Sequence, residues 1–393
     1  MKKIILIFAF IFIFSMTIFA DEAKINEPNV NAHGAILMDF NTGRVLWEKN
    51  SKTPLAMAST TKIMTAIVAL EMANLEDVVK VSRKAAVSPQ VKMSLSENEE
   101  IKLEYLLYAL MLQSYNDSAV AIAEHISGSV EEFCRLMTEK AKELGATDTI
   151  FETPSGLDLG EHQSTAYDMA IITRYALKNE KFMKIINTPN ITVSSNKRTY
   201  NLVNKNRLLN EFDGANGVKT GFTGKAGHCF VGSAKRNDMQ LISVVLASGW
   251  GNMGKEQKWR DTKEILSYGF NAYEYHDIID MGDIAGSIEI ERSKTAQIEL
   301  MYSEDFFLPL NKQELENLSV EAYFPEILRA PVTKGDTLGS VRVFIDGNTV
   351  KEIDLIATDS AERHDLKTSL EKVLTNWISQ ATNKEANVIL PEF

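Results

Sequence analysis

The stretch Ser59-Thr60-Thr61-Lys62-Ile63-Met64-Thr65-Ala66-Ile67-Val68-Ala69-Leu70 places a hydroxyl and an amine at the start of an apolar helical run. Residues three apart on a helix share one face, so the Lys62 amine can reach the Ser59 hydroxyl. If burial keeps that amine neutral, it can accept the Ser59 proton and leave a nucleophilic oxygen. The helix N-terminus favours a developing anion. The same Ser-x-x-Lys spacing occurs at 194–197 and 369–372, so context must identify the functional copy.

Two later triplets supply that context. Ser114-Tyr115-Asn116 lies in a short break between apolar helical patterns at 103–112 and 119–126. Lys219-Thr220-Gly221 occurs once, in a segment with the pattern of a strand. Ser-x-x-Lys at a helix start, Ser-x-Asn between helices and Lys-Thr-Gly on a strand, in this order, are typical of penicillin-binding proteins and class A β-lactamases.

The chain resembles the low-molecular-weight penicillin-binding proteins, the serine-type D-Ala-D-Ala carboxypeptidases. Further stretches similar to that family lie at 53–59, 155–158, 164–170 and 213–221. The resemblance covers nearly the whole chain after the first twenty or so residues. It implies a hydrolase that removes the terminal D-alanine of peptidoglycan pentapeptide stems through an acyl-serine intermediate, and that β-lactams inhibit by covalent binding.

The arrangement of patterns predicts an α/β (α+β) fold for the first part of the mature chain. Helical patterns dominate from the Ser-x-x-Lys motif to about residue 186, between strands on either side. The expected elements are a hairpin of 35–40 and 44–48, strands at 217–223, 228–234 and 240–247, and a helix at 259–273. These elements favour one antiparallel five-stranded sheet flanked by helices. The resemblance implies the serine β-lactamase/transpeptidase-like form of this architecture.

From about residue 275 the pattern changes to short strands, which predicts a smaller all-β domain. These strands are expected at 287–291, 297–301, 319–324, 340–345 and 351–357, the last two joined by a turn at Asp346-Gly347. The predicted domains are a signal peptide at 1–20, a penicillin-binding peptidase domain at 21–274, the all-β domain at 275–360 and an amphipathic membrane-associating tail at 361–393.

The tail carries a continuous apolar stripe at helical spacing. Its members are Leu366, Leu370, Val373, Leu374, Trp377, Ile378 and Ala381. Docking of this helix onto the β-domain is one way to bury the stripe. The resemblance favours the other, peripheral attachment to the outer face of the cytoplasmic membrane, and Trp377 suits an interface.

The N-terminus predicts export. Basic residues at 1–3, an apolar run at 4–14 and the small residue Ala20 are typical of a secretory signal peptide, with cleavage expected after Ala20. Ile18 is larger than the usual residue near a cleavage site, which leaves an uncleaved anchor as an alternative. The formal charge is −11, about −13 without the signal, and such a charge argues against a nucleic-acid partner. We expect an extracytoplasmic protein on the periplasmic or cell-wall side.

Hydrolysis of an amide needs a nucleophile, a base and a proton donor for the leaving amine. Ser59 is the predicted nucleophile and Lys62 the predicted base. Ser114 is expected to pass a proton to the departing nitrogen, through Lys62 or Lys219. Asn116 is expected to hydrogen-bond the substrate amide; it can also cap the following helix.

Substrate binding is assigned to the Lys-Thr-Gly triplet. Lys219 and Thr220 offer an ammonium and a hydroxyl to the carboxylate of a terminal D-alanine. Gly221 is expected to let the substrate backbone come close to the strand. The resemblance implies an oxyanion hole formed by the backbone N–H groups of Ser59 and Phe222.

Other polar residues are given lesser roles. His162 and His228 are interpreted as structural, and Arg207 is a candidate for additional positive charge near the site. No metal or other cofactor is expected, because neither His-Glu-x-x-His nor Cys-x-x-Cys occurs. Cys134 and Cys229 are too few for a disulfide framework and are interpreted as buried thiols.

Two other functions stay open at this point. A β-lactamase shares the three motifs but also needs a deacylating glutamate between the second and third. Glu152 and Glu161 lie in that interval without the Glu-x-x-x-Asn spacing of those enzymes. The second alternative is a non-catalytic β-lactam sensor, whose acylated Ser59 would persist as a signal. Peptide turnover distinguishes a carboxypeptidase from a stalled acyl-enzyme.

Overall fold

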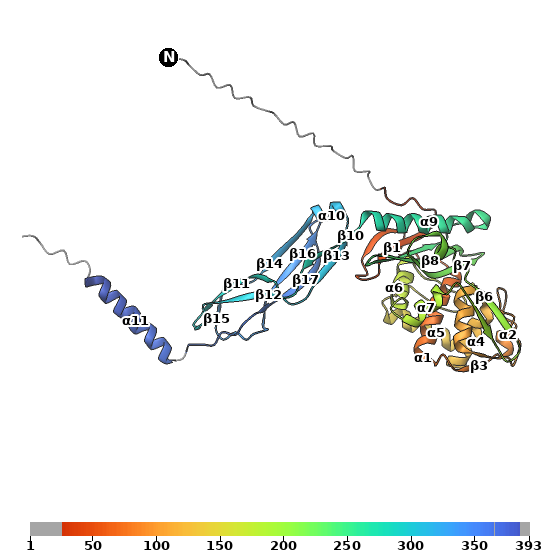
Figure 1. Ribbon diagram of the computed structural model, residues 1–393, viewed down its shortest axis with the longest axis horizontal. Helices are drawn as coiled ribbons and strands as arrows, with labels where there is room; N and C mark the ends of the chain where they lie inside the picture. Colours follow the sequence, from red (N-terminus) through yellow and green to blue (C-terminus); the bar gives the residue numbers. More distant parts are fainter. Residues whose placement is uncertain (1–25, 365, 386–393) are drawn as a thin grey trace, which may run out of the picture.

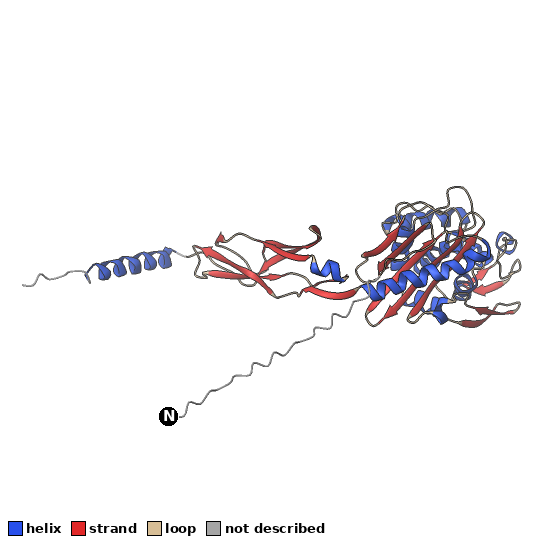
Figure 2. Cartoon of the chain, turned by 90° about the horizontal axis from the view of Figure 1, so that it is seen from above, coloured by secondary structure: helices blue, strands red, loops and turns tan. Residues whose placement is uncertain are grey.

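The computed structural model of the protein describes residues 26–364 and 366–385. A mixed helical and stranded body is followed by an elongated β-domain, and helix α11 (Leu366–Glu385) comes after it (Figures 1 and 2). The predicted signal peptide at 1–20 lies outside the described residues and stays a prediction.

The first body is built on an antiparallel five-stranded sheet, as predicted. In spatial order its strands are β2 (Val45–Lys49), β1 (Gly34–Asp39), β9 (Met239–Leu246), β8 (Gly227–Arg236) and β7 (Ala215–Thr223). Along β1, Ile36 and Met38 pack into one core while Ala35 and Leu37 pack into the core on the opposite face. Both faces of the strand are therefore covered, which explains why it is a continuous apolar run.

Helices cover both faces of this sheet (Figure 1). Helix α9 (Gly251–Ala272) lies along one face. The opposite face carries a layer of helices that are α1 (Lys62–Met72), α3 (Leu103–Tyr108), α4 (Asn116–Ser127), α5 (Val130–Glu143), α6 (Ala166–Ala176) and α7 (Glu180–Asn187). Shorter helical turns are η1 (Ala58–Thr61), α2 (Arg83–Ala86), η2 (Ala109–Gln113) and α8 (Leu208–Glu211). Ser129, Thr165 and Asn179 cap α5, α6 and α7 by accepting backbone N–H groups.

Two small hairpins and the start of α9 differ from the prediction. Strands β3 (Val78–Lys80) and β4 (Glu100–Lys102) pair within the region predicted to be helical. Strands β5 (Asn190–Ser194) and β6 (Thr199–Val203) form a second pair that was not predicted. Strands β3 and β4, of three residues each, are too short to show a period. Strands β5 and β6 alternate over only five residues each, and this weak signal was overlooked. Helix α9 begins at Gly251, whereas the prediction placed its start at Trp259. The first two turns were missed because they are mostly polar and show no apolar face.

The second body is all-β, as predicted. Its six-stranded sheet has the order β14 (Leu318–Tyr323), β16 (Thr337–Ile345), β17 (Asn348–Ala357), β12 (Gln297–Tyr302), β11 (Ile284–Glu291) and β15 (Ile327–Arg329). The elements that were not predicted are β10 (Glu274–Ile279), β13 (Phe306–Leu310), β15 and α10 (Lys312–Glu316). Alternate residues of β16 and β17, among them Val341, Val343, Ile353 and Leu355, form the core of this domain.

The β-domain contacts the first body beside the β1–β2 hairpin. The Arg44 guanidinium pairs with the Glu314 carboxylate, and both side chains are mostly buried. The Asn41 side chain donates to the Tyr275 hydroxyl over 2.8 Å. Polar contacts of this kind fix an orientation between domains more than they stabilise it.

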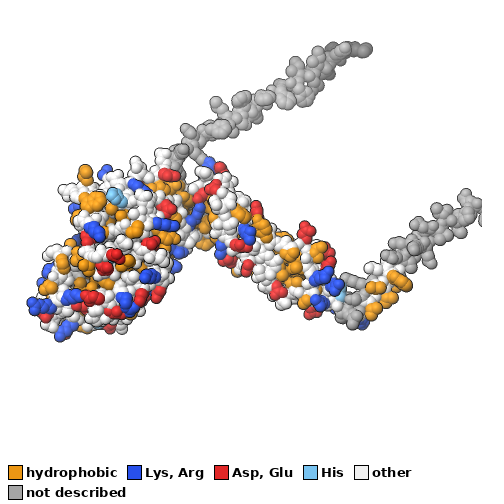
Figure 3. Space-filling model, turned by 180° about the vertical axis from the view of Figure 1, so that it is seen from behind, with side chains coloured by type: hydrophobic (Ala, Val, Ile, Leu, Met, Phe, Trp, Pro, Cys, Tyr) orange, Lys and Arg blue, Asp and Glu red, His pale blue; other side chains and the backbone are white. Residues whose placement is uncertain are grey.

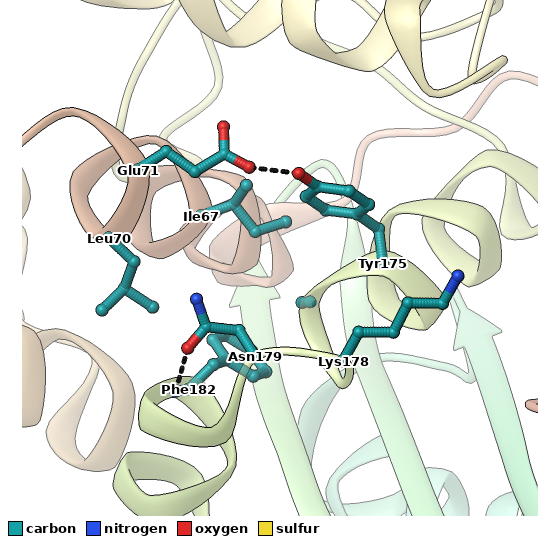
Figure 4. A pocket seen from close by; sticks show the side chains of 8 residues that line it. Ile67, Leu70, Glu71, Tyr175, Lys178, Asn179 and Phe182 are labelled. Carbon is teal, nitrogen blue, oxygen red and sulfur yellow. Dashed lines mark hydrogen bonds between the residues drawn. The ribbon is translucent and has the colours of Figure 1, made fainter.

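A hollow of about 230 Å³ lies among α1, α6 and α7 (Figure 4). The Tyr175 hydroxyl donates to the Glu71 carboxylate at its rim, and Lys140 pairs with the same carboxylate over 2.9 Å. Asn179 accepts the backbone N–H of Phe182 over 3.1 Å. These polar groups are already paired with one another, so the hollow is a feature of helix packing.

Helix α11 occupies the region where the sequence predicted an amphipathic helix. Its apolar side chains Leu370, Val373, Leu374, Trp377 and Ile378 are exposed, Trp377 by 73%. Hydrophobic side chains are visible on the surface of this helix in Figure 3. Within the described residues, no helix combines the length and apolarity needed to cross a membrane.

Candidate active site

The turn η1 carries Ser59 and passes directly into α1, whose first residue is Lys62. The predicted proximity is confirmed, since Lys62 Nζ lies 2.8 Å from Ser59 Oγ. Lys62 is fully buried, and its amine also donates to Asn116 Oδ1 over 2.9 Å and to the backbone carbonyl of Ser155. Ser59 therefore lies in a 3₁₀ turn just before the α-helix, and the amine beneath it is held by contacts from three segments.

These three contacts would satisfy a protonated amine, which donates to all three oxygens, and they are also compatible with a neutral one. A neutral –NH₂ group has two hydrogens and one lone pair. In the neutral form, Asn116 Oδ1 and the Ser155 carbonyl can accept the two hydrogens, and the lone pair of Lys62 is then free to accept from the Ser59 hydroxyl 2.8 Å away. Burial lowers the pKa of Lys62 well below its usual value, the charge of Lys219 lowers it further, and Asp117 partly opposes both effects.

Ser114 and Asn116 lie where the helical layer is interrupted between η2 and α4, as predicted. Ser114 has a left-handed backbone (φ 68°), which ends η2 and turns its side chain toward β7. Its hydroxyl accepts from Lys219 Nζ over 2.8 Å. The Asn116 amide donates to the backbone carbonyls of Pro89 (3.2 Å) and Gln90 (3.1 Å). Ser114 is thus linked to Lys219, while Asn116 joins Lys62 to the 89–90 segment.

The Lys-Thr-Gly triplet lies on β7, the edge strand of the sheet. Lys219 is buried, and burial lowers the pKa of its amine to about 7, helped by the charges of Lys205 and Lys258. A Cβ added to Gly221 would lie 3.1 Å from Met57 O and from Ser59 N. The close approach that calls for glycine here is therefore that of the η1 turn, in addition to any approach by substrate.

These groups surround a pocket of about 260 Å³. Its lining residues are Ser59, Gln90, Val91, Gln113, Ser114, Asn116, Gly156, Leu157, Lys205, Thr220, Gly221, Phe222, Thr223, His228, Lys255 and Lys258. Five predicted site residues, which are Ser59, Ser114, Asn116, Thr220 and Gly221, and the backbone donor candidate Phe222 therefore share one pocket. The amines of Lys62 and Lys219 lie behind this lining, each bonded to a lining hydroxyl.

Sequence reasoning missed the positive charge that faces this pocket. Lys205, Lys255 and Lys258 line it, and burial lowers the pKa of Lys258 to about 8. The predicted candidate for this charge, Arg207, instead pairs with Glu211 and Glu256. Lys255 and Lys258 are three apart on α9, a spacing that by itself is common on exposed helix faces and gave no indication of the site.

The remaining polar candidates have structural partners. Cys134 and Cys229 are buried free thiols, as predicted. His162 contacts Thr61, and His228 contacts the Gly251 carbonyl while its ring stacks on Phe222. Among residues 26–364 and 366–385, no group of three or more His, Cys, Asp or Glu side chains is placed to hold a metal ion.

Comparison with known proteins agrees with this geometry. A family model described as D-alanyl-D-alanine carboxypeptidase, peptidase S11, matches residues 21–249, more than half of the chain. The chain belongs to the D-alanyl-D-alanine carboxypeptidase family. A second model, described as the C-terminal domain of penicillin-binding protein 5, matches residues 273–363 of this carboxypeptidase-family chain.

Relatives of this family member are similar over almost their full length. It is 34% identical to D-alanyl-D-alanine carboxypeptidase DacF of Bacillus subtilis, over 91% of this chain and 92% of the relative. It is 31% identical to DacC of Escherichia coli, over 90% of each chain. The crystal structure of penicillin binding protein 5 from Haemophilus influenzae superimposes with a TM-score of 0.72 at 29% identity, covering 86% of this chain and 99% of that one.

The family assignment confirms the predicted resemblance and the predicted fold class. The protein is a serine-type peptidase of the D-alanyl-D-alanine carboxypeptidase family. The two alternative functions, a β-lactamase and a non-catalytic sensor, are not favoured by these similarities.

Proposed function

We propose that this carboxypeptidase removes the terminal D-alanine from peptidoglycan pentapeptide stems through an acyl-Ser59 intermediate. The observation that supports this most directly is the contact of 2.8 Å between Ser59 Oγ and the buried Lys62 amine. Ser59 Oγ attacks the carbonyl carbon of the penultimate D-alanine while Lys62 takes its proton. The backbone N–H groups of Ser59 and Phe222 receive the developing oxyanion.

The departing D-alanine needs a proton on its nitrogen. Ser114 supplies it in this proposal, because its hydroxyl lines the pocket and is bonded to the Lys219 amine behind it. With a pKa lowered to about 7, Lys219 can exchange a proton with that hydroxyl near neutral pH. Water then attacks the acyl-Ser59 ester and gives a proton through Ser114 to the Lys219 amine left neutral by the first step, while Lys62 returns its proton to Ser59 Oγ and the shortened stem is released.

Substrate recognition uses the charge of the pocket. Thr220, on the pocket lining, binds the terminal carboxylate, and Lys219 contributes the charge of its amine from behind the lining, with Gly221 allowing the close approach of η1 and substrate to β7. The charged lining residues Lys205 and Lys258 add a positive field that suits a carboxylate. Asn116 binds the substrate amide by exchanging one of its two backbone acceptors for it.

The pocket also bears on the β-lactamase alternative. Deacylation by a glutamate requires a carboxylate beside the acyl-serine. The charged residues that line this pocket are instead the lysines Lys205, Lys255 and Lys258. We therefore expect slow release of bound β-lactam and efficient turnover of peptide.

The first prediction tests the peptidase assignment. Incubation of the protein with a peptide ending in D-Ala-D-Ala is expected to release free D-alanine, measured by an amino-acid oxidase assay or mass spectrometry. The same peptide with an amidated C-terminus is expected to lose roughly 2–5 kcal/mol of transition-state stabilisation, because the buried charge pair with Lys219 is broken. Equal turnover of acid and amide would place recognition elsewhere, and penicillin turnover without D-alanine release would favour the β-lactamase.

The setting of this activity is a further part of the proposal. Because stem peptides are cell-wall material, the protein acts outside the cytoplasm after export by the segment at 1–20. We propose domains at 21–274 for the peptidase and 275–360 for the β-domain, with the tail at 361–393 attached to the outer face of the cytoplasmic membrane. The exposed apolar side chains of α11 support this attachment over docking onto the β-domain.

A second prediction tests the tail. The protein truncated before Leu366 is expected to remain in the soluble fraction after signal removal, with unchanged D-alanine release. Lys367 and Glu371, on the described part of α11, carry opposite charges, so attachment of the full chain should be chiefly hydrophobic and resist high salt. Trp377→Ala is the matched variant and should weaken attachment without changing activity. Membrane fractionation of the truncated protein, or its unfolding, would contradict the assignment.

A further inference from the structure

His162 is a buried histidine that the proposed chemistry does not use. Its side chain is 2% exposed and lies in the 152–163 segment that faces η1. Its Nε2 lies 2.8 Å from the Thr61 hydroxyl, and its Nδ1 accepts the backbone N–H groups of Glu152 (3.0 Å) and Thr153 (3.4 Å). Both ring nitrogens therefore have partners: Nε2 contacts Thr61 of the η1 turn, and Nδ1 contacts the backbone of the 152–163 segment.

The partners fix the tautomer of the ring. Because Nδ1 accepts two N–H groups, the proton of the neutral imidazole is on Nε2 and is donated to Thr61 Oγ1. The Thr61 hydroxyl in turn donates to the Ala58 carbonyl over 2.8 Å. A directed chain of hydrogen bonds thus runs from His162 through Thr61 to the residue that precedes Ser59.

The backbone of Ala58 has an unfavourable conformation, which contacts from neighbouring groups help to hold. Its φ is +48°, a left-handed conformation that residues other than glycine rarely adopt. The 152–163 segment packs directly on this peptide, since a Cβ added to Gly156 would lie 1.9 Å from Ala58 O. The same segment provides the Ser155 carbonyl that accepts from Lys62 Nζ. His162 therefore joins the turn that carries the nucleophile to the segment that holds the base.

We propose that His162 is a positioning residue for acylation, which acts through Thr61 to hold the Ala58–Ser59 peptide and the Ser155 carbonyl in register. The inference rests on the proposed role of Ser59 as the nucleophile. Loss of this link displaces Ser59 Oγ relative to Lys62 Nζ, and a displacement of about 1 Å can cost about 100-fold in rate.

The electrostatic environment keeps His162 in the required form. Burial lowers the pKa of the ring to about 4. Asp158 opposes this shift, while Lys225 and Lys62 add to it. The imidazole is therefore neutral at physiological pH, with Nδ1 available to accept the backbone N–H groups.

Two substitutions at 162 separate the halves of the link. His162→Gln can present an amide N–H near the Nε2 position and keep the bond to Thr61. His162→Asn is too short to reach Thr61 but can keep an oxygen near the Nδ1 position. We expect the acylation rate constant with labelled penicillin to fall about 10- to 100-fold in His162→Asn and only a few-fold in His162→Gln, with the noncovalent affinity for penicillin unchanged in both. Parental acylation by His162→Asn would overturn the inference.

A pair of variants at 61 tests the same link without altering the 152–163 segment, in case His162→Asn does not fold. Thr61→Val removes the hydroxyl and should slow acylation as His162→Asn does, whereas Thr61→Ser should keep the parental rate. The double variant should lose no more than either single one, because both remove one shared link. Multiplicative losses, or parental acylation by a folded Thr61→Val protein, would overturn the inference. Labelling of Ser59→Ala would instead overturn the proposed function, so the two failures are distinguishable.

Discussion

Replacing Ser59 by alanine is expected to abolish covalent labelling of the protein by a fluorescent penicillin. The strained amide and the carboxylate of penicillin resemble a D-Ala-D-Ala terminus, so the drug should acylate the same oxygen as the peptide. The Ser59 hydroxyl lines the pocket with Lys62 behind it, and alanine leaves no group there to form an ester. Labelling is measured on a denaturing gel and as the mass of the penicillin adduct.

The second described Ser-x-x-Lys copy provides a matched control for this prediction. Ser194 is exposed on β5, and its hydroxyl bonds to Thr199 across the hairpin. Ser194→Ala should therefore retain full labelling. Ser59→Ala should keep the parental thermal unfolding midpoint, because it removes only a partly buried hydroxyl. Undiminished labelling of a folded Ser59→Ala protein would show that Ser59 is not the nucleophile.

Much of the fold was predictable because its central strands are buried on both faces. Strands β1, β8 and β9 are mostly buried and bounded by turns, so their existence and approximate bounds follow from local pattern, whereas the edge strands β2 and β7 are more polar. The order β2-β1-β9-β8-β7 joins the two ends of the first domain. One shared sheet was expected, because the helical region lies between a strand pair at its N-terminal end and three strands at its C-terminal end.

The elements that sequence reasoning missed depend on long-range contacts. Strands β3 and β4 are three residues each and pair across about twenty residues of other structure. Strand β5 is mostly exposed, with Val193 as its one buried residue, and its alternation of polar and apolar residues, only five residues long, was overlooked. The first two turns of α9 were also missed, because local periodicity indicates a helix only where one face is apolar and these turns are mostly polar.

The site shows a similar division. The order of the three motifs correctly identified neighbours in space, since Ser59 and Ser114 line one pocket and Lys219 is bonded to Ser114. The carbonyl of Ser155 is a main acceptor for the Lys62 amine, but a backbone group has no sequence signature. The lysines Lys205, Lys255 and Lys258 face the pocket only through the packing of separate segments. The proximity of the motif side chains was therefore predictable, while the backbone acceptor and the convergent charge required the structure.

Replacing Lys62 by alanine is expected to slow acylation of Ser59 by roughly 10²–10⁴-fold, the range typical of a positioned general base. The structural reason is the arrangement of acceptors, since Asn116 Oδ1 and the Ser155 carbonyl can take both hydrogens of a neutral amine and leave its lone pair for Ser59. Stopped-flow or quenched labelling with penicillin measures the acylation rate constant. Binding before acylation should change less, because the Lys62 amine lies behind the pocket lining.

The pH dependence and an arginine variant separate a base from a fixed charge. Only the neutral Lys62 amine can accept a proton, so the parental acylation rate should rise as the pH increases through its lowered pKa, and fall below it. Lys62→Arg keeps a positive charge that cannot be removed at these pH values. If Lys62 acts as the base, Lys62→Arg should acylate as slowly as Lys62→Ala and lose this rise with pH. The Lys219 amine, with its pKa lowered to about 7, also titrates in this range. We therefore assign the rise of the acylation rate with pH to Lys62 only if the rise disappears in the Lys62 variants and persists in Lys219→Arg.

Near-parental acylation by a folded Lys62→Arg protein would mean that Lys62 acts through its charge, and the base would have to be sought in the pair of Ser114 and Lys219.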